Sequence, residues 1–155
     1  INLVANIVLA PLMGHAVARW GERKALLFEY FGLICVFLAY GGIYLFGWGV
    51  LLAAALYILD HMFFGLALAL KTYFQKIADP ADIAPTAAVA FTINHISAVF
   101  LPVLLGFLWL TSPTAVFCVA ASIAALSFLL ALLIPRHPQP GAETLLTRAA
   151  TAAAE

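Results

Sequence analysis

The sequence predicts an all-α, polytopic membrane protein with about five transmembrane helices. Hydrophobic residues make up 66% of the chain and charged residues only 9%, whereas a typical soluble domain has about 25% charged residues. The mean hydropathy of +1.10 is too high for a chain that covers itself with polar surface in water. The apolar runs are long and continuous, unlike the alternating segments of roughly ten residues that build membrane barrels. A net charge of zero gives no indication of a nucleic-acid partner.

Five apolar runs are long enough to cross a hydrocarbon core of roughly 30 Å as helices. Residues 1–135 are therefore predicted to form one transmembrane bundle, followed by a tail over residues 136–155. Ile1 already lies in an apolar run and no signal region precedes it, so we expect that the sequence begins inside a longer protein. The predicted spans cover residues 1–18, 25–46, 48–72, 86–110 and 114–134.

Three connections carry recognisable local signals. The sequence FGWG at 46–49 predicts a tight glycine turn between the second and third spans. Asp79 followed by Pro80 predicts a helix start, with the aspartate as cap and proline at the first helical position. Ser112 followed by Pro113 predicts the same arrangement before the last span. These three signals therefore divide the apolar sequence into distinct spans.

The basic residues predict the orientation of the bundle. With alternating spans, every lysine and arginine falls on one side of the membrane, and the positive-inside rule makes that side cytoplasmic. The C-terminal tail is then cytoplasmic, and Trp48 and Trp109 fall at the opposite interface, where an aromatic belt is expected. The seven basic residues are Arg19, Arg23, Lys24, Lys71, Lys76, Arg136 and Arg148.

The stretch GHAVARWGERK at 14–24 resembles the signature loop of the major facilitator superfamily. That signature reads Gly, three residues, Asp-Arg, any residue, Gly, Arg, then Arg or Lys. Ala18 stands here in place of the acid, and Glu22 in place of one arginine. The positions that match are Gly14, Arg19, Gly21 and Arg23.

The resemblance implies a fold and a function for residues 1–135. A degraded signature loop followed by four spans looks like helices eight to twelve of a twelve-helix transporter, so the N-terminal half would be a missing partner. It implies secondary active transport of a small solute, and we expect proton coupling and a bacterial inner membrane. In the family, the helices similar to the first, third and fourth spans line the cavity.

In the family, the acid and the arginine of this loop form a charge network that latches the inward side of the transporter. The network is incomplete here, because Ala18 replaces the acid. Two interpretations of the loop stay open. Arg19 pairs instead with Asp79 or Asp82 in the other cytoplasmic connection, or the basic residues only anchor the topology at the anionic membrane surface. Gly14 and Gly21 are expected to permit a close backbone approach and a tight turn.

Ionisable residues inside spans are costly and usually face a cavity or a partner. The candidate substrate or proton pathway consists of Asp60, His61, Asn94 and His95. For Asp60 a proton- or substrate-binding role and a structural hydrogen bond between helices both stay open, and His61 points about 100° away from it. Glu29 lies one turn inside the second span, where we expect it to reach the headgroups or pair with Arg23 or Lys24.

The sequence contains no catalytic set, no phosphate-binding glycine loop and no metal-ligand spacing. We therefore expect no enzyme activity, no metal and no cofactor, with a small solute and the bilayer as partners. The alternative function is a non-transporting membrane scaffold or interaction subunit that keeps the fold. Cys35 and Cys118 lie in apolar runs, which favours a packing role for both.

Overall fold

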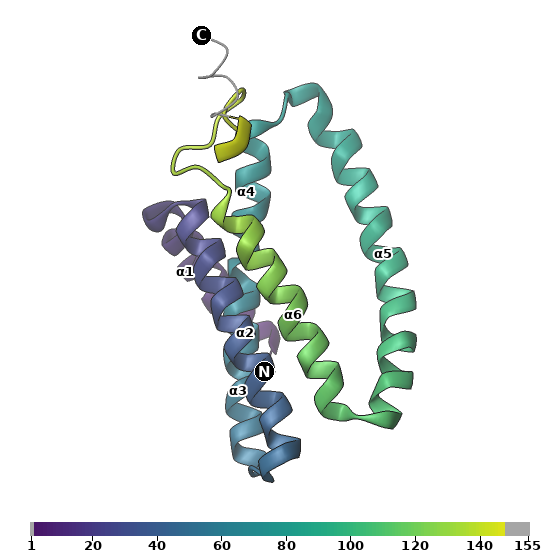
Figure 1. Cartoon of the computed structure of the whole chain (residues 1–155). Coiled ribbons are helices and arrows are strands. Elements are labelled where there is room, and N and C mark those ends of the chain that lie inside the picture. The colour runs from purple at the N-terminus through teal and green to yellow at the C-terminus, as the bar shows by residue number, and fades with distance from the viewer. Residues whose placement is uncertain (1, 148–155) are drawn as a thin grey trace.

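The computed structural model describes residues 2–147 of the chain, and side chains from residue 11 onward. It confirms the all-α prediction, since almost all of this part is helical (Figure 1). α3 and α4 form one continuous rod, because only a single 3₁₀ turn, η1, separates them. The elements are α1 (Asn2–Trp20), α2 (Glu22–Phe46), α3 (Val50–Phe64), η1 (Gly65–Ala67), α4 (Leu68–Ile77), α5 (Pro80–Thr111) and α6 (Pro113–Leu132).

Four helical segments in the described residues are long and apolar enough to cross a membrane, which identifies a polytopic membrane protein. The first predicted span forms α1, which is not among these four. The side chains of its first half lie outside the described residues, so its crossing of the membrane stays a prediction. The four segments are Glu22–Phe46, Val50–Ile77, Pro80–Thr111 and Pro113–Leu132.

The predicted helix starts at Asp79 and Ser112 are confirmed. The Ala81 N–H donates to Asp79 Oδ1 over 2.9 Å, and the Ala115 N–H donates to Ser112 Oγ over 3.2 Å. Each bond satisfies one of the amide groups that the first turn of a helix leaves without a carbonyl partner. The glycine turn is also confirmed, since α2 ends at Gly47 in the left-handed conformation. Residues at the helix ends themselves therefore determine where α2 ends and where α5 and α6 begin.

Helix α2 is the centre of the bundle, with α6 packed along its length and α1, α3 and α4 on its other sides (Figure 1). Gly32 of α2 faces the ring of Phe63 so closely that a Cβ atom there would overlap the ring. The Gly65 backbone likewise lies against Met13 of α1, and Ala69 one turn on is fully buried. Gly65 and Ala69 thus form a step of two small residues that lets the helices approach closely. The core comprises Val17, Ala25, Leu26, Leu66, Ala69, Ala131 and Ile134.

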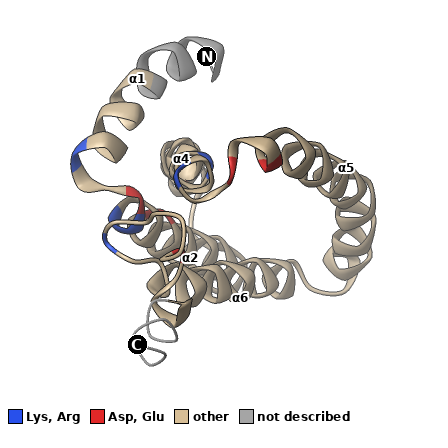
Figure 2. Ribbon diagram, turned by 90° about the horizontal axis from the view of Figure 1, so that it is seen from above, with Lys and Arg blue, Asp and Glu red and all other residues tan. Residues whose placement is uncertain are grey.

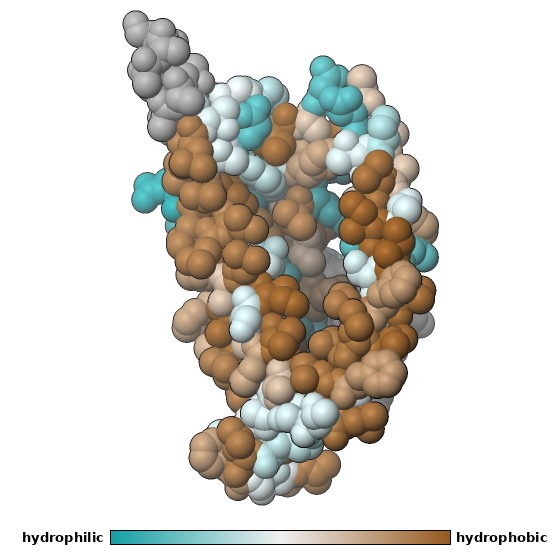
Figure 3. All heavy atoms as spheres, turned by 45° about the vertical axis from the view of Figure 1, so that its right-hand side comes forward, coloured by the Kyte–Doolittle hydropathy of each residue, from teal (hydrophilic) through white to brown (hydrophobic). Residues whose placement is uncertain are grey.

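Helix α5 stands apart from this bundle. It runs without interruption through Pro85 and Pro102, and none of its residues is buried. It approaches α6 at the turn that joins them and separates from the bundle toward its other end (Figure 1). Apolar side chains cover the middle of the molecule, and a hollow separates the part formed by α5 from the rest (Figure 3).

An aromatic cluster lies at the end of the bundle where α5 meets α6. The Tyr44 ring lies 5.4 Å from that of Trp109 and 6.1 Å from that of Phe117, and Tyr40 stacks on Phe117. Trp48 stacks on Phe46 in the adjoining turn. Such rings favour the membrane–water interface, and the location of this cluster at that interface stays a prediction.

Candidate functional site

A groove between α4 and the first half of α5 is the main candidate for a solute site, and we call it the α4–α5 groove. Its volume is about 570 Å³, and it is open to the outside. Asn94, predicted from the sequence as a polar contact, lies on its wall. The full lining is Leu70, Lys71, Phe74, Gln75, Ile83, Thr86, Ala87, Ala90, Phe91 and Asn94.

The lining is mostly apolar with a few polar groups, as is typical of small-molecule sites. Lys71 supplies the one charged side chain among these residues, and Gln75 and Asn94 supply amides that both donate and accept hydrogen bonds. Sequence reasoning did not select Lys71 or Gln75, since both lie near the predicted end of a span. The groove therefore suits a solute with an apolar body and a few polar groups.

Asp60 and His61 lie together on α3, outside this lining. Their closest approach is 3.9 Å between His61 Nδ1 and Asp60 Oδ2, and both side chains are about one-third exposed. His61 Nδ1 lies closer to the Tyr57 carbonyl oxygen, at 3.2 Å, and its ring packs on the Tyr57 ring. A carbonyl only accepts, so Nδ1 donates to it. Asp60 thus lies within ion-pair distance of His61, whose shorter contact is with Tyr57, and the roles of both residues stay predictions.

His95 repeats the arrangement of His61 on α5. Its Nδ1 donates to the Phe91 carbonyl oxygen over 3.0 Å, and the two ring centroids lie 4.0 Å apart. With the proton on Nδ1, the neutral ring keeps Nε2 as an acceptor. His95 is exposed and is not part of the groove lining. Of the four residues predicted for the pathway, Asp60 and His61 thus lie on α3, and Asn94 and His95 lie on α5. Only Asn94 lines the groove.

The expectation for Glu29 is wrong. Its side chain is buried, at 3% exposure, among the helices, so it does not reach the headgroups. It forms no ion pair with Arg23 or Lys24, and its Oε2 atom has no hydrogen-bond partner among the described residues. Glu22, two helical turns earlier in α2, is also buried.

The stretch 14–24, which resembles a signature loop, has a single residue outside a helix. Gly21 joins α1 to α2 with a φ of 80°, which favours glycine and agrees with the predicted tight turn. Gly14 lies inside α1, and a Cβ atom there would have no neighbour within 4 Å among the described residues, so they make no close approach at this position. The pairing of Arg19 with Asp79 or Asp82, one of the two open interpretations of the loop, is not present, because the exposed Arg19 forms no ion pair with any described residue.

The ion pair at this end of the bundle joins Glu22 to Lys76 instead. The two charged atoms lie 2.6 Å apart, with the carboxylate 6% exposed and the lysine 53% exposed. Arg23 Nη2 donates to the Leu132 carbonyl oxygen at the end of α6, over 3.2 Å. The start of α2 is therefore tied to both α4 and α6.

We call this end of the bundle the basic end. Here α1 meets α2, α4 meets α5 and the chain leaves α6, and lysines and arginines gather there (Figure 2). After α6 the chain folds back, with the Leu145 N–H bonded to the Leu133 carbonyl and the Tyr73 hydroxyl to the Glu143 carbonyl. Backbone hydrogen bonds from Glu143 itself and Gly141 hold the pKa of the Glu143 carboxyl below its usual value. Arg148, a basic residue used for the orientation, lies outside the described residues.

No group of three or more histidine, cysteine or acidic side chains in the described residues is placed to hold a metal ion. Comparisons with protein-family models, with curated proteins and with solved structures give no match for this chain. The fold defines an all-α integral membrane protein.

Proposed function

We propose that the chain is part of a secondary active transporter that moves a small solute with proton coupling. Its membrane is a bacterial inner membrane, its tail is cytoplasmic, and a second helical half completes the cavity. The observation that carries this proposal is the α4–α5 groove with the unburied helix α5 on its outer side. The signature-like loop at 14–24 and the one-sided basic residues support it.

The composition of α5 favours a protein partner over lipid alone. Thr92, Asn94, His95 and Ser97 lie in its middle, and all but Ser97 are exposed. Polar side chains in an apolar helix usually face a cavity or another helix, because contact with lipid is costly. A second half-bundle packed on α5 would cover these groups and close the open groove near the bilayer midplane.

The groove also adjoins a break in helix regularity. The 3₁₀ turn at Gly65–Ala67 directly precedes the α4 residues that line the groove, and such turns often mark a hinge. Movement of α4 relative to α3 at this turn would open and close the groove, as alternating access requires.

The access of water to the groove is testable with cysteine labelling. In a background with Cys35 and Cys118 replaced by alanine, Asn94→Cys should react with a membrane-impermeant thiol reagent. Ile96→Cys is the control, because it lies at a similar depth, about 200° around the helix and outside the lining. Equal labelling of both positions would contradict a water-filled groove on the Asn94 side.

Proton coupling is testable at Asp60 in the full-length protein. A screen of amino acids, sugars and organic cations in proteoliposomes identifies a transported solute, and a pH-sensitive dye reports proton movement. We expect Asp60→Asn to abolish proton-driven accumulation while solute exchange remains, and Asp82→Asn at the exposed start of α5 to change neither. Unchanged coupling in Asp60→Asn would overturn the assignment. The absence of flux for every solute would favour the scaffold function.

A further inference from the structure

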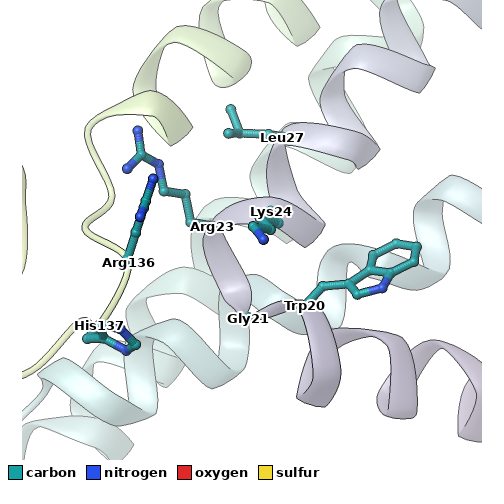
Figure 4. Close-up of a pocket in the computed structure, with 7 residues that line it drawn as sticks. All are labelled: Trp20, Gly21, Arg23, Lys24, Leu27, Arg136 and His137. Atoms are coloured by element: carbon teal, nitrogen blue, oxygen red, sulfur yellow. The ribbon is translucent and has the colours of Figure 1, made fainter.

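A second cavity lies at the basic end, and we call it the basic pocket. It has a volume of about 420 Å³. Its walls come from the junction of α1 and α2 and from the chain that leaves α6, two segments more than a hundred residues apart in sequence. The lining is Trp20, Gly21, Arg23, Lys24, Leu27, Arg136 and His137 (Figure 4).

The charges of the basic pocket are uncompensated within its lining. Arg23, Lys24 and Arg136 are cations, His137 adds a titratable ring, and none of the described residues that line the cavity is acidic. The nearest acid in sequence, Glu22, is buried and pairs with Lys76 on α4. The side chains of Arg23 and Arg136 run toward each other (Figure 4). Like charges that converge repel each other unless an anion lies between them.

We propose that the basic pocket binds the phosphate of an anionic phospholipid headgroup. Guanidinium groups match phosphate oxygens with paired hydrogen bonds, and a lysine adds a point charge. Arg23 uses one nitrogen for the Leu132 carbonyl and keeps the others for a ligand. Basic pockets at membrane-facing helix ends are established places for acidic lipid headgroups.

The apolar part of the pocket favours a lipid over free phosphate. Trp20 and Leu27 line it beside the cations. Phe28 is 51% exposed and packs edge-on against Trp20 at 5.7 Å. Phe31, one turn beyond Leu27, is 58% exposed beside Phe128 of α6 at 6.4 Å. An exposed apolar strip therefore runs from the pocket along α2 into the membrane segment, where an acyl chain would lie.

This inference does not depend on transport, since it concerns the outer wall of α2 rather than the groove. Trp20 provides a local probe once Trp48→Phe and Trp109→Phe have removed the other two tryptophans. The full chain is reconstituted in phosphatidylcholine vesicles with increasing phosphatidylglycerol. Quenching of Trp20 by dibrominated acyl chains is then compared for the two lipids.

We expect brominated phosphatidylglycerol to bind beside Trp20 several-fold more tightly than brominated phosphatidylcholine. Each cation removed from the pocket should reduce that preference about fivefold. Arg136→Gln is the main variant, because Arg136 is exposed and forms no hydrogen bond in the described structure, so its loss should leave the fold intact. Arg136→Lys should retain most of the preference.

Arg19→Gln is the matched control, because Arg19 is exposed at the same end of the bundle but lies outside the pocket. A loss equal to that of Arg136→Gln would overturn the proposal in favour of general surface attraction. Equal quenching by the two lipids in the protein without these substitutions would also overturn it. If millimolar inorganic phosphate displaced phosphatidylglycerol completely at constant ionic strength, the ligand would be the free anion and the lipid assignment would be wrong.

Discussion

The Glu22 carboxylate and the Lys76 ammonium group form an ion pair of 2.6 Å between the first turn of α2 and the last turn of α4. The two partners differ in environment, since the carboxylate is almost completely buried and the lysine is half exposed. The pair holds the helix that forms one wall of the α4–α5 groove against the central helix. Glu22 is one of the positions at which the stretch 14–24 differs from the signature that it resembles, and here it supplies a contact of its own.

The asymmetry predicts unequal effects of removing the two partners. Lys76→Gln should lower stability by about 2 kcal/mol, because it leaves a buried carboxylate without its cation. Glu22→Gln should cost less, because the released Lys76 is hydrated at the surface. Thermal unfolding in detergent, followed by circular dichroism, measures both effects. Lys71→Gln is the control, since Lys71 forms no ion pair with any described residue, and a larger effect of Glu22→Gln than of Lys76→Gln would contradict the prediction.

The contact of Gly32 with Phe63 predicts that Gly32→Ala destabilises the bundle by about 1–3 kcal/mol, because the added methyl group overlaps the ring. Gly106→Ala is the matched control. A Cβ atom at Gly106 meets nothing within 4 Å, so alanine there should stabilise the helix by up to about 1 kcal/mol. Phe63→Leu should partly rescue Gly32→Ala. Equal melting temperatures of the two glycine variants would show that α2 and α3 are not this close.

The cap at Asp79 predicts a local effect at the start of α5. Asp79→Ala removes the acceptor of the Ala81 N–H and should cost about 1 kcal/mol, whereas Asp79→Ser should retain most of the stability. Asp82→Ala, in the same first turn, should cost only a few tenths of a kcal/mol through the helix dipole. Hydrogen exchange of the α5 amides measures the difference, and equal protection in both alanine variants would contradict it.

The helix ends were predictable because their causes are local. Asp79–Pro80, Ser112–Pro113 and the turn at 46–49 each contain the residues that satisfy or terminate a helix. The 3₁₀ turn at Gly65–Ala67 was not predicted, because the apolar run passes through it without any change of composition.

The long-range contacts were not predictable for a different reason. In a membrane helix both the lipid-facing and the core-facing residues are apolar, so the pattern does not reveal which face is buried. The sequence therefore indicated that Glu29 lies near a helix end but not that α2 turns it inward. For the same reason, the sequence did not predict that Glu22 pairs with Lys76 or that Arg136 approaches Arg23.

The buried Glu29 predicts a substitution that stabilises the protein. Its Oε2 atom has no hydrogen-bond partner among the described residues, and a buried polar group without a partner costs about 1–3 kcal/mol. Glu29→Met keeps the length of the side chain and removes the polar group, so we expect a higher melting temperature in detergent. Glu22→Met is the matched control on the same face of α2, where the carboxylate has its partner, and it should lower the melting temperature.

The comparison of Glu29→Met with Glu22→Met shows whether the buried Glu29 carboxyl has a stabilising partner. If Glu29→Met lowered stability as much as Glu22→Met, the Glu29 carboxyl would have a stabilising partner and the prediction would be wrong. Repeating the measurement with Glu29→Gln separates the two causes, because glutamine keeps the hydrogen-bonding capacity and removes only the titratable group. A gain with methionine and none with glutamine is the result expected when the unsatisfied polar atom itself is what destabilises the core.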